Sequence, residues 1–321
     1  MATEQRQQVL ALSGGVGGAR LAWGLARRLA PDQLTLLANT GDDFQHLGLT
    51  ICPDLDTLLY SLSERADRER GWGLAEESWR VHQTLAELGG PTWFQLGDRD
   101  LATHLYRSHR LAEGASLTEV TAELARRMGL SLTLLPMSDD PVQTRVQTAA
   151  GELEFQHWFV GQQCGPEVTG FRFAGAESAR LQPDAAALLA SGSLTAIVLC
   201  PSNPFVSIAP LLALPGLRQA LRQAGAPVVA VCPIIGGQAV KGPTAKIMAE
   251  LGLEVSALGV ARHYRGLLDG LVIDEADAHL AAAIAELGMA VRVMPTWMRS
   301  PEDQDRLAGG VLDFAATLSA A

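Results

Sequence analysis

Short apolar runs recur along the chain and alternate, over much of its length, with stretches of helical periodicity. The runs are typical of strands buried on both faces, and they occupy residues 8–12, 34–38, 130–135, 194–200, 227–232, 271–274 and 291–294. Stretches with apolar residues three and four apart follow at 19–29, 276–287 and 301–318. This alternation predicts an α/β fold with a Rossmann-like, doubly wound, mainly parallel sheet.

Two regions break the alternation. The first has helical periodicity at 57–68, 76–88, 101–111 and 117–128, and it predicts an almost wholly helical lobe from Asp56 to Met128, laid over the ligand edge of the sheet. The second has strand patterns at 142–147 and 153–160, which predict a small β-hairpin. Because no linker or repeat interrupts the chain, we expect a single domain over residues 1–321, with the helical insertion at 57–130.

Composition and charge narrow the class of protein. Hydrophobic residues make up 48% of the chain and charged residues 19%, which is typical of a globular protein. The net charge of −10 argues against nucleic acid or an anionic membrane as a partner. The polar N-terminus, Met1 to Gln8, lacks a signal-peptide core, and no run is long enough to span a membrane. We expect a cytoplasmic protein whose widely spaced cysteines are reduced packing residues.

A glycine-rich loop follows the first predicted strand and precedes the first helix. Gly14, Gly15, Gly17 and Gly18 lie in this loop, and Arg20 lies in the first turn of the helix. Backbone N–H groups in this setting bind phosphate or a similar anion, and the arginine would add a positive charge. Alternatively, the glycines serve only to let the helix pack closely on the strand.

Two acidic segments come next and carry the strongest chemical signal. Asn39 and Thr40 lead into Asp42 and Asp43 at the end of the second strand, and Asp54 and Asp56 follow. Crowded carboxylates without Cys or His are suitable ligands for Mg²⁺. The alternative is structural: a turn at Asp42 and Asp43, and a helix beginning near Thr57 that the later pair caps.

Polar loops at later element ends supply further candidates. Asp98 and Arg99 precede a helix on which His104 and Arg107 share a face, as a phosphate-contacting pair would; helix capping and a structural histidine are the alternatives. Ser202 and Asn203 follow one buried strand, and Gly236, Gly237 and Lys241 follow the next. Within the helical region, Trp72, Trp79, Trp93 and Phe94 suit either stacking on a flat heterocycle or core packing.

Taken together and in this order, the motifs make the sequence resemble the 2-phospho-L-lactate transferase family, which acts in the biosynthesis of the deazaflavin coenzyme F420. The resemblance covers nearly the whole chain. The motifs are Ser13–Arg20, Asn39–Asp43, Pro53–Thr57, Leu96–His104, Leu135–Asp140, Pro201–Pro204, and Ile234–Gly237 with Lys241–Pro243.

The resemblance implies a specific reaction. Members transfer a phosphorylated three-carbon acid from a guanosine diphosphate-linked donor to the ribityl hydroxyl of 7,8-didemethyl-8-hydroxy-5-deazariboflavin, and GMP is released. The acid is 2-phospholactyl, phosphoenolpyruvyl or 3-phosphoglyceryl, and no residue here distinguishes them. The family pattern implies Mg²⁺ as cofactor and small molecules as the partners. The apolar faces of the predicted helices could support a homodimer, and the sequence does not fix the oligomeric state.

The resemblance also assigns roles to residues. Mg²⁺ would be held by some of Asp42, Asp43, Asp54 and Asp56, and one carboxylate would accept the hydroxyl proton; the catalytic candidates are Asp42, Asp43 and Asp56. The guanosine diphosphate would be held by Ser202, Asn203, Gly236, Gly237 and Lys241. The deazaflavin and the transferred group would face Gly14, Gly15, Gly17, Gly18, Arg20, Asn39, Thr40, Asp98, Arg99 and His104.

Two other classes of protein remain as alternatives. The first is the related family of nucleotide-sugar-binding regulators of carbon metabolism and cell shape, which share the glycine loop and an Asp-Asp motif. Those proteins typically continue with Gly-Gly-Ser-Ser, whereas Phe44–Leu47 follow here. The second is a dinucleotide-dependent oxidoreductase, which the first loop argues against because it departs from the usual glycine fingerprint.

Overall fold

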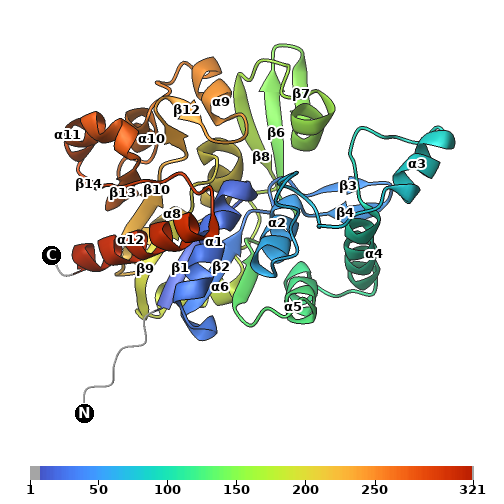
Figure 1. Ribbon diagram of the computed structural model, residues 1–321, viewed down its shortest axis with the longest axis horizontal. Coiled ribbons are helices and arrows are strands. Elements are labelled where there is room, and N and C mark those ends of the chain that lie inside the picture. The colour runs from blue at the N-terminus through green and yellow to red at the C-terminus, as the bar shows by residue number, and fades with distance from the viewer. Residues whose placement is uncertain (1–7, 320–321) are drawn as a thin grey trace.

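The computed structural model describes residues 8–319, and a parallel sheet of seven strands runs through its centre (Figure 1). The strand order is β14-β13-β10-β9-β1-β2-β5, and every pair of neighbours is parallel. The strands are β1 (Gln8–Ser13), β2 (Leu34–Ala38), β5 (Thr133–Pro136), β9 (Leu194–Leu199), β10 (Val228–Val231), β13 (Gly270–Ile273) and β14 (Ala290–Val293). Each overlaps its predicted apolar run, and the doubly wound α/β fold is confirmed.

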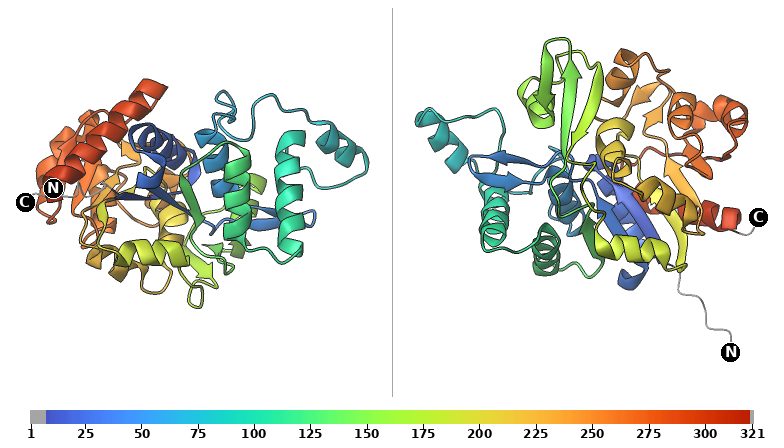
Figure 2. Two further views of the ribbon diagram at one scale, coloured as in Figure 1. Left: turned by 90° about the horizontal axis from the view of Figure 1, so that it is seen from below. Right: turned by 180° about the vertical axis from the view of Figure 1, so that it is seen from behind.

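Both faces of the sheet are covered by helices, which explains why its strands are apolar throughout. Successive residues of a strand point to opposite faces. Val9 and Ala11 of β1 therefore pack under one helical layer, and Leu10 and Leu12 under the other. Figure 2 (left) shows the two layers. The first contains α1 (Gly15–Arg28), α2 (Pro53–Leu62), α5 (Leu117–Arg127) and α12 (Pro301–Ser319); the second contains α6 (Pro183–Ala190), α8 (Leu217–Gln223) and α10 (Ala257–His263).

The chain changes direction across the sheet between β1 and β9. From β1 it proceeds through β2 to β5 at one edge, and from β9 it proceeds through β10 and β13 to β14 at the other. The loops at the carboxyl ends of β1 and β9 therefore turn away from each other. Such a switch point leaves a crevice in which open α/β sheets bind their ligands.

The region between β2 and β5 is less helical than predicted. A hairpin of β3 (Phe44–His46) and β4 (Leu49–Ile51) precedes its helices, and residues 63–79 and 88–97 contain no helix. The first helix, α2, begins at Pro53 rather than near Thr57, because proline at the first helical position leaves no N–H unpaired. The others are α3 (Arg80–Glu87), which buries no residue and projects from the body in Figure 1, and α4 (Asp98–Ala112).

The predicted β-hairpin is part of a larger unit. Strands β6 (Gln143–Thr148) and β7 (Gly151–Glu154) form the hairpin, and β8 (Gly170–Ala174) adds a third antiparallel strand on the far side of β6. The second predicted strand ends early, because residues His157–Gly161 form a π-helical turn. This turn carries Phe159, which lines the site described below.

Short elements complete the described part of the chain. They are η1 (Pro31–Gln33), a π-helical turn η3 (Pro204–Ile208), α7 (Ala209–Leu212), β11 (Ile234–Ile235), β12 (Gln238–Ala239), α9 (Thr244–Glu250), η4 (Glu275–Leu280) and α11 (Ala281–Ala285). The predicted helix at 276–287 is thus a 3-10 segment followed by a short α-helix. The four cysteines are free thiols, and three of them are buried, as expected of packing residues.

Within residues 8–319, no single helix has the length and apolar character to cross a membrane; only the pair Pro204–Leu212 and Leu217–Gln223, bent by 83°, meets those two criteria jointly. The polar N-terminal stretch, apart from Gln8, lies outside the described residues.

Candidate active site

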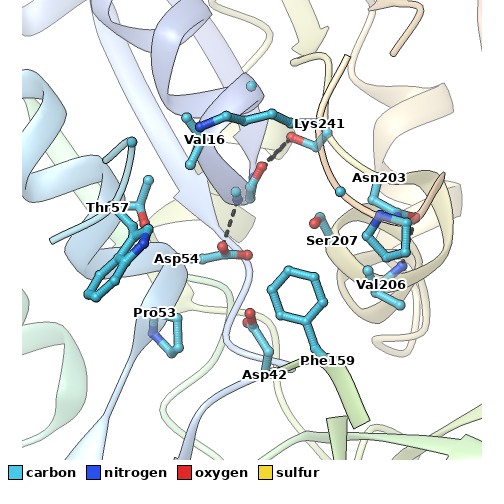
Figure 3. Close-up of a pocket in the computed structure, with 18 of the residues that line it drawn as sticks. Val16, Asp42, Pro53, Asp54, Thr57, Phe159, Asn203, Val206, Ser207 and Lys241 are labelled. Atoms are coloured by element: carbon cyan, nitrogen blue, oxygen red, sulfur yellow. Dashed lines mark hydrogen bonds between the residues drawn. The ribbon is translucent and has the colours of Figure 1, made fainter. Parts of the chain in front are cut away.

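One large cavity lies at the switch point, at the carboxyl ends of β1, β2, β9 and β10. Its volume is about 780 Å³, which is ample for a ligand larger than a single nucleotide. Figure 3 shows its centre, where Asp42 and Asp54 face Asn203 and Ser207. Of the residues predicted from sequence, those that line it are Gly14, Gly15, Gly17, Arg20, Asp42, Asp54, Asp56, His104, Ser202, Asn203 and Lys241.

The glycine-rich stretch is shaped by close contacts. Helix α1 begins inside it, at Gly15, and not at Ala19 as predicted. A Cβ atom at Gly14 would lie 2.4 Å from Asp54 Oδ2, and one at Gly17 would lie 2.5 Å from the Pro201 carbonyl oxygen. The N–H of Gly15 donates to Asp54 Oδ1 at 2.6 Å. The start of α1 therefore binds a carboxylate of the protein itself, whereas the sequence predicted that it would bind phosphate or a similar anion of a ligand.

Two buried carboxylates form the acidic centre of the cavity. A single side chain, Asn39, donates from Nδ2 to Asp42 Oδ1 and to Asp54 Oδ2, at 2.9 Å each. Burial raises the pKa of Asp42 well above its ordinary value, and the charges of Asp54 and Asp43 raise it further. Burial also raises the pKa of Asp54, to about 6, against the opposing hydrogen bonds from Asn39 and Gly15. Both carboxylates would hold their charge more readily beside a cation.

Asp56 belongs to a different, self-neutralised network. Arg107 Nη1 donates to Asp56 Oδ2 at 3.0 Å, and Nη2 of the same guanidinium donates to the other oxygen. His104 Nε2 lies 3.3 Å from Asp100 Oδ1, which also accepts from Tyr60 at 2.6 Å. Burial works against the charged form of Asp100, but the hydrogen bond and charge of His104 hold its pKa below the ordinary value.

This network corrects one expectation. Arg107 is only 1% exposed and does not line the cavity, so it neutralises Asp56 rather than a substrate phosphate. Asp43 is also set apart: it does not line the main cavity, and burial raises its pKa. Within residues 8–319, no three His, Cys, Asp or Glu side chains are arranged to hold a metal ion. The four carboxylates therefore do not form one cage, and Asp42 and Asp54 stand alone as a pair.

Cationic and amide groups lie across the cavity from the carboxylates. Lys241 extends over the top of the cavity in Figure 3, and burial and the charge of Arg20 lower its pKa. Arg20 also donates to the Met298 carbonyl oxygen at 2.8 Å. Asn203 caps the η3 turn through its Oδ1, whereas its buried Nδ2 has no partner within the described part of the chain. Asn203 therefore lines the cavity with one side-chain donor unpaired among the described residues.

Aromatic side chains from five separate segments form much of the remaining wall. They are Tyr60, Trp72, Trp93, Phe94, Phe155, Phe159 and Trp297. Trp93 stacks on His157, with ring centroids 4.3 Å apart, and so joins the segment before α4 to the π-helical turn. Trp72 is held by Arg70, whose guanidinium lies 4.8 Å from the Trp72 ring centroid and 4.9 Å from that of Trp79.

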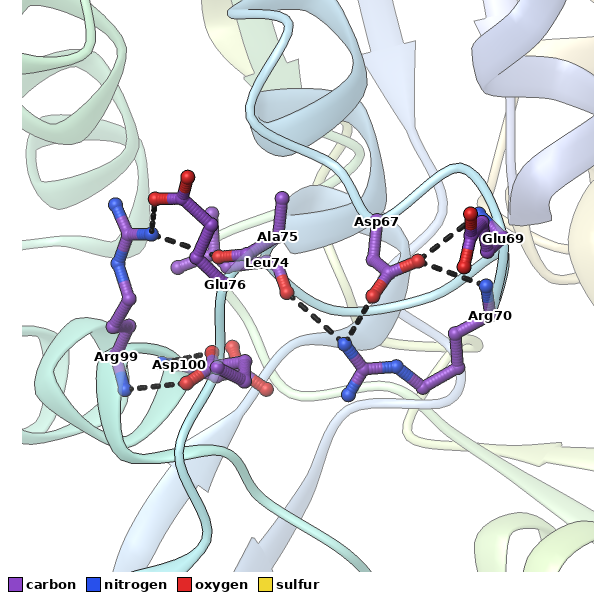
Figure 4. Close-up of polar contacts among 9 residues, drawn as sticks. Asp67, Glu69, Arg70, Leu74, Ala75, Glu76, Arg99 and Asp100 are labelled. Carbon is purple, nitrogen blue, oxygen red and sulfur yellow. Dashed lines mark hydrogen bonds and ion pairs between the residues drawn. The ribbon is translucent and has the colours of Figure 1, made fainter.

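The loop that presents Trp72 is ordered by its own polar contacts (Figure 4). Asp67 Oδ1 accepts from the N–H of Glu69 and of Arg70, and the Arg70 guanidinium donates to Asp67 Oδ2 and to the Leu74 carbonyl oxygen. The exposed aromatic ring is therefore carried by a preformed loop.

Comparison with known proteins decides the family. Residues 9–293 match the family model described as 2-phospho-L-lactate transferase CofD.

The chain belongs to this family.

Curated relatives agree with this assignment, and a solved structure shares the fold. A phosphoenolpyruvate transferase of Kitasatospora aureofaciens is 41% identical over 315 residues, which cover 96% of this chain and 98% of that protein. A 2-phospho-L-lactate transferase of Methanosarcina mazei is 40% identical over 300 residues, covering 94% and 98%. A crystal structure of a UPF0052-family protein from Bacillus halodurans has a TM-score of 0.62 at 15% identity, over 96% and 99% of the two chains, and shows a shared fold.

Membership of the CofD family confirms the resemblance drawn from the motifs. The named relatives are transferases, which supports a transferase activity for this chain and weighs against the regulator and oxidoreductase alternatives. The cavity is therefore the candidate active site of a transferase.

Several residues predicted to bind substrate do not line the cavity of this CofD-family chain. They are Gly18, Asn39, Thr40, Asp98, Arg99, Gly236 and Gly237. Asp98 instead accepts from Ser78 and from the first N–H groups of α3, and Arg99 donates to the Ala75 carbonyl oxygen at 2.7 Å (Figure 4). The N–H of Gly236 donates to Asp277. Asn39 is buried behind the two carboxylates it binds.

Other lining residues were missed by sequence reasoning. Phe155, Gln156 and Phe159 come from the antiparallel sheet and its π-helical turn, while Ser207 and Trp297 follow β9 and β14. Only Trp297 carried a usable signal, because a tryptophan just after a predicted strand end is in the right place for a ligand edge. Phe155, Gln156 and Phe159 reach the cavity through the packing of the small sheet against the large one, and Ser207 reaches it from the η3 turn.

Proposed function

We propose that this chain transfers a phosphorylated three-carbon acid, either 2-phospholactyl, phosphoenolpyruvyl or 3-phosphoglyceryl, from a guanosine diphosphate-linked donor to the ribityl hydroxyl of 7,8-didemethyl-8-hydroxy-5-deazariboflavin. GMP is the second product, and the reaction belongs to coenzyme F420 biosynthesis. The observation that carries the proposal is a single cavity of about 780 Å³ in which paired carboxylates, cationic side chains and aromatic rings meet. The names of the curated relatives support the same class of reaction.

The chemistry of the cavity suits Mg²⁺. Asp42 and Asp54 are hard oxygen donors, both less than a tenth exposed, and burial raises the pKa of each, so a cation beside them would favour their charged forms. Mg²⁺ is commonly held by one or two carboxylates together with substrate phosphates, so these two residues would hold it. Bound there, the ion would neutralise phosphate charge and polarise the reacting phosphorus. Asp56 would not contribute, because Arg107 already neutralises it.

The two substrates would lie along the cavity according to its polarity. Asn203 Nδ2 would donate to the guanine or ribose part of the donor, and Lys241 and Arg20 would neutralise its diphosphate. The flat deazaflavin ring would stack against the aromatic wall near Trp93 and Phe159. This arrangement brings the ribityl chain toward the carboxylates, so that most of the rate enhancement comes from positioning and charge neutralisation.

Asp42 is the catalytic candidate that fits the transfer step. The ribityl hydroxyl oxygen attacks the phosphorus that carries the three-carbon acid, the bond from that phosphorus to the bridging oxygen breaks, and GMP leaves with the electron pair. The hydroxyl proton passes to a carboxylate. Asp42 Oδ2 has one contact, with Gln156 at 3.5 Å, whereas both oxygens of Asp54 accept short hydrogen bonds. Asp42 Oδ2 is therefore the less occupied carboxylate oxygen of the pair, and it would accept the proton.

The decisive experiment incubates the purified chain with Mg²⁺, the deazariboflavin acceptor and each of the three guanylated donors. Products are followed by mass spectrometry, with and without a chelator. A metal-dependent adduct from one donor, with GMP in equal amount, would support the proposal and identify the acid. Absence of any adduct would refute it.

Matched variants connect the activity to the site. Asp42→Asn should lower kcat roughly 10²–10⁴-fold, as expected for loss of a proton acceptor. Asp140→Asn serves as the control, because Asp140 pairs with Arg180 on a turn outside the cavity. Equal loss in both variants would point to a general effect on folding rather than to the carboxylate.

A further inference from the structure

Asn39 is the residue that connects the acidic centre to the rest of the sheet. Its backbone N–H donates to the Ser13 carbonyl oxygen at 3.0 Å, which extends the pairing of β1 and β2 by one residue. Its side chain is fully buried and does not line the cavity. A residue in this place cannot contact a substrate directly, contrary to the role that the motif resemblance implied.

The hydrogen bonds of the Asn39 amide determine its orientation. Its Oδ1 accepts from the N–H of Gly41 at 2.9 Å, so the oxygen is the atom that faces the loop. Its Nδ2 therefore faces Asp42 Oδ1 and Asp54 Oδ2, at 2.9 Å each, with the Val206 carbonyl oxygen farther away at 3.3 Å. An amide nitrogen has two hydrogens. The two carboxylates are the nearest of its three acceptors.

We propose that Asn39 is a positioning residue, whose single amide holds the carboxylates of Asp42 and Asp54 side by side as one binding unit for a divalent cation. This proposal rests on the proposed function, because it specifies how the acidic centre of that site is assembled. The two aspartates come from different elements, the loop after β2 and the first turn of α2. Without a shared donor, two buried carboxylates would repel each other and move apart.

The positioning role explains why position 39 is asparagine. Aspartate at position 39 would place a third carboxylate against the pair, and serine is too short to reach both oxygens. Replacing such an outer partner of a metal ligand typically lowers metal affinity or activity by roughly ten- to a hundredfold. We therefore expect Asn39→Asp and Asn39→Ser to weaken cation binding by roughly 10–100-fold.

The test measures cation binding directly, without turnover. Mn²⁺ is titrated into wild type and variants in the presence of GDP, and free Mn²⁺ is followed by electron paramagnetic resonance. Gln182→Glu is the matched control: Gln182 is also a buried amide, 3% exposed, but it caps α6 outside the cavity. Both amide-to-acid variants should lose stability, whereas only Asn39→Asp should lose Mn²⁺ affinity.

Steady-state kinetics provide a second readout. If Asn39 positions the carboxylates, its variants lower kcat and raise the Mg²⁺ concentration for half-maximal rate, while the KM for the acceptor stays unchanged. Asn39→Ser is included because Asn39→Asp could fail to fold. Wild-type Mn²⁺ affinity and kcat in a folded Asn39→Ser would overturn the proposal, as would a raised KM for the acceptor at unchanged Mn²⁺ affinity.

The outcomes separate this proposal from the proposed function. Suppose that the wild type binds Mn²⁺, that the Asn39 variants bind it more weakly, and that the wild type transfers none of the three acids. That result would refute the proposed function and support the role of Asn39. If the wild type transfers one of the acids and both Asn39 variants bind Mn²⁺ as tightly as the wild type, the proposed function is supported and the role of Asn39 is refuted.

Discussion

Replacing Asp54 by asparagine should stabilise the metal-free protein at neutral pH. Asp54 is 5% exposed, and its pKa is raised from an ordinary 3.8 to about 6, mainly by burial. At about 1.4 kcal/mol per unit, charging this side chain in the folded state costs about 3 kcal/mol. Asparagine at position 54 still accepts the hydrogen bond from the Gly15 N–H, but its amide nitrogen faces the donor of Asn39. The hydrogen bond from Asn39 is therefore lost, at a cost of about 1 kcal/mol. The net gain at pH 7.5 is then about 2 kcal/mol.

The stabilisation by Asp54→Asn should depend on pH. Because the folded pKa of Asp54 lies above its unfolded value, its protonation stabilises the fold; this contribution is complete below about pH 4 and is lost as the pH rises through about 6. At pH 5 the wild type has recovered about half of the cost, so the advantage of Asp54→Asn shrinks to about 1 kcal/mol or less. Urea unfolding in the presence of a chelator, at pH 5.0 and 7.5, measures both values.

Asp56→Asn is the informative control, since the two residues share the first turn of α2 and should respond in opposite directions. Asparagine at 56 leaves the buried guanidinium of Arg107 without its counter-charge, which should lower the free energy of unfolding by about 3–5 kcal/mol. The reasoning would be refuted if Asp54→Asn were less stable than wild type at pH 7.5, or if its advantage did not depend on pH. Mg²⁺ with GDP should stabilise the wild type and not Asp54→Asn.

Three further variants test other parts of the site. Gly14→Ala places a Cβ 2.4 Å from Asp54 Oδ2 and should lower kcat in a steady-state assay. The far-ultraviolet circular dichroism spectrum should stay native, and a wild-type kcat would contradict the close packing at Gly14. Lys241→Met should raise the KM for the guanylated donor about tenfold or more and leave the KM for the acceptor unchanged, and the reverse pattern would reassign the two ends of the cavity. Trp93→Ala should raise the KM for the acceptor about tenfold, and an unchanged value would exclude stacking there.

Much of the fold followed from local pattern. The apolar runs at β1, β2, β9 and β10 are long enough, and apolar enough on both faces, to admit only a doubly covered parallel sheet. Helix boundaries were less well predicted. Periodicity marks the buried face of a helix but not its first turn, so the starts of α1 and α2 inside glycine and Pro-Asp stretches were placed late.

The sequence also indicated part of the ligand edge. Polar and glycine-rich segments at the carboxyl ends of neighbouring parallel strands lie at one edge of the sheet, so the loops after β9 and β10 were predicted to share a crevice. Ser202, Asn203 and Lys241 do line the cavity, whereas Gly236 and Gly237 do not. The order of the motifs likewise pointed to the transferase family. These are properties of residue type and chain order, which the sequence contains directly.

Only the tertiary structure decided what each acidic residue does. Asp54 and Asp56 are two positions apart and chemically identical, yet one faces Asp42 across Asn39 and the other is neutralised by Arg107 from a helix about fifty residues away. The charge that a carboxylate retains depends on its burial and on its partners in space. Those partners come from the start of α1, the loop after β2 and α4, and no spacing along the chain specifies which of them will be in contact.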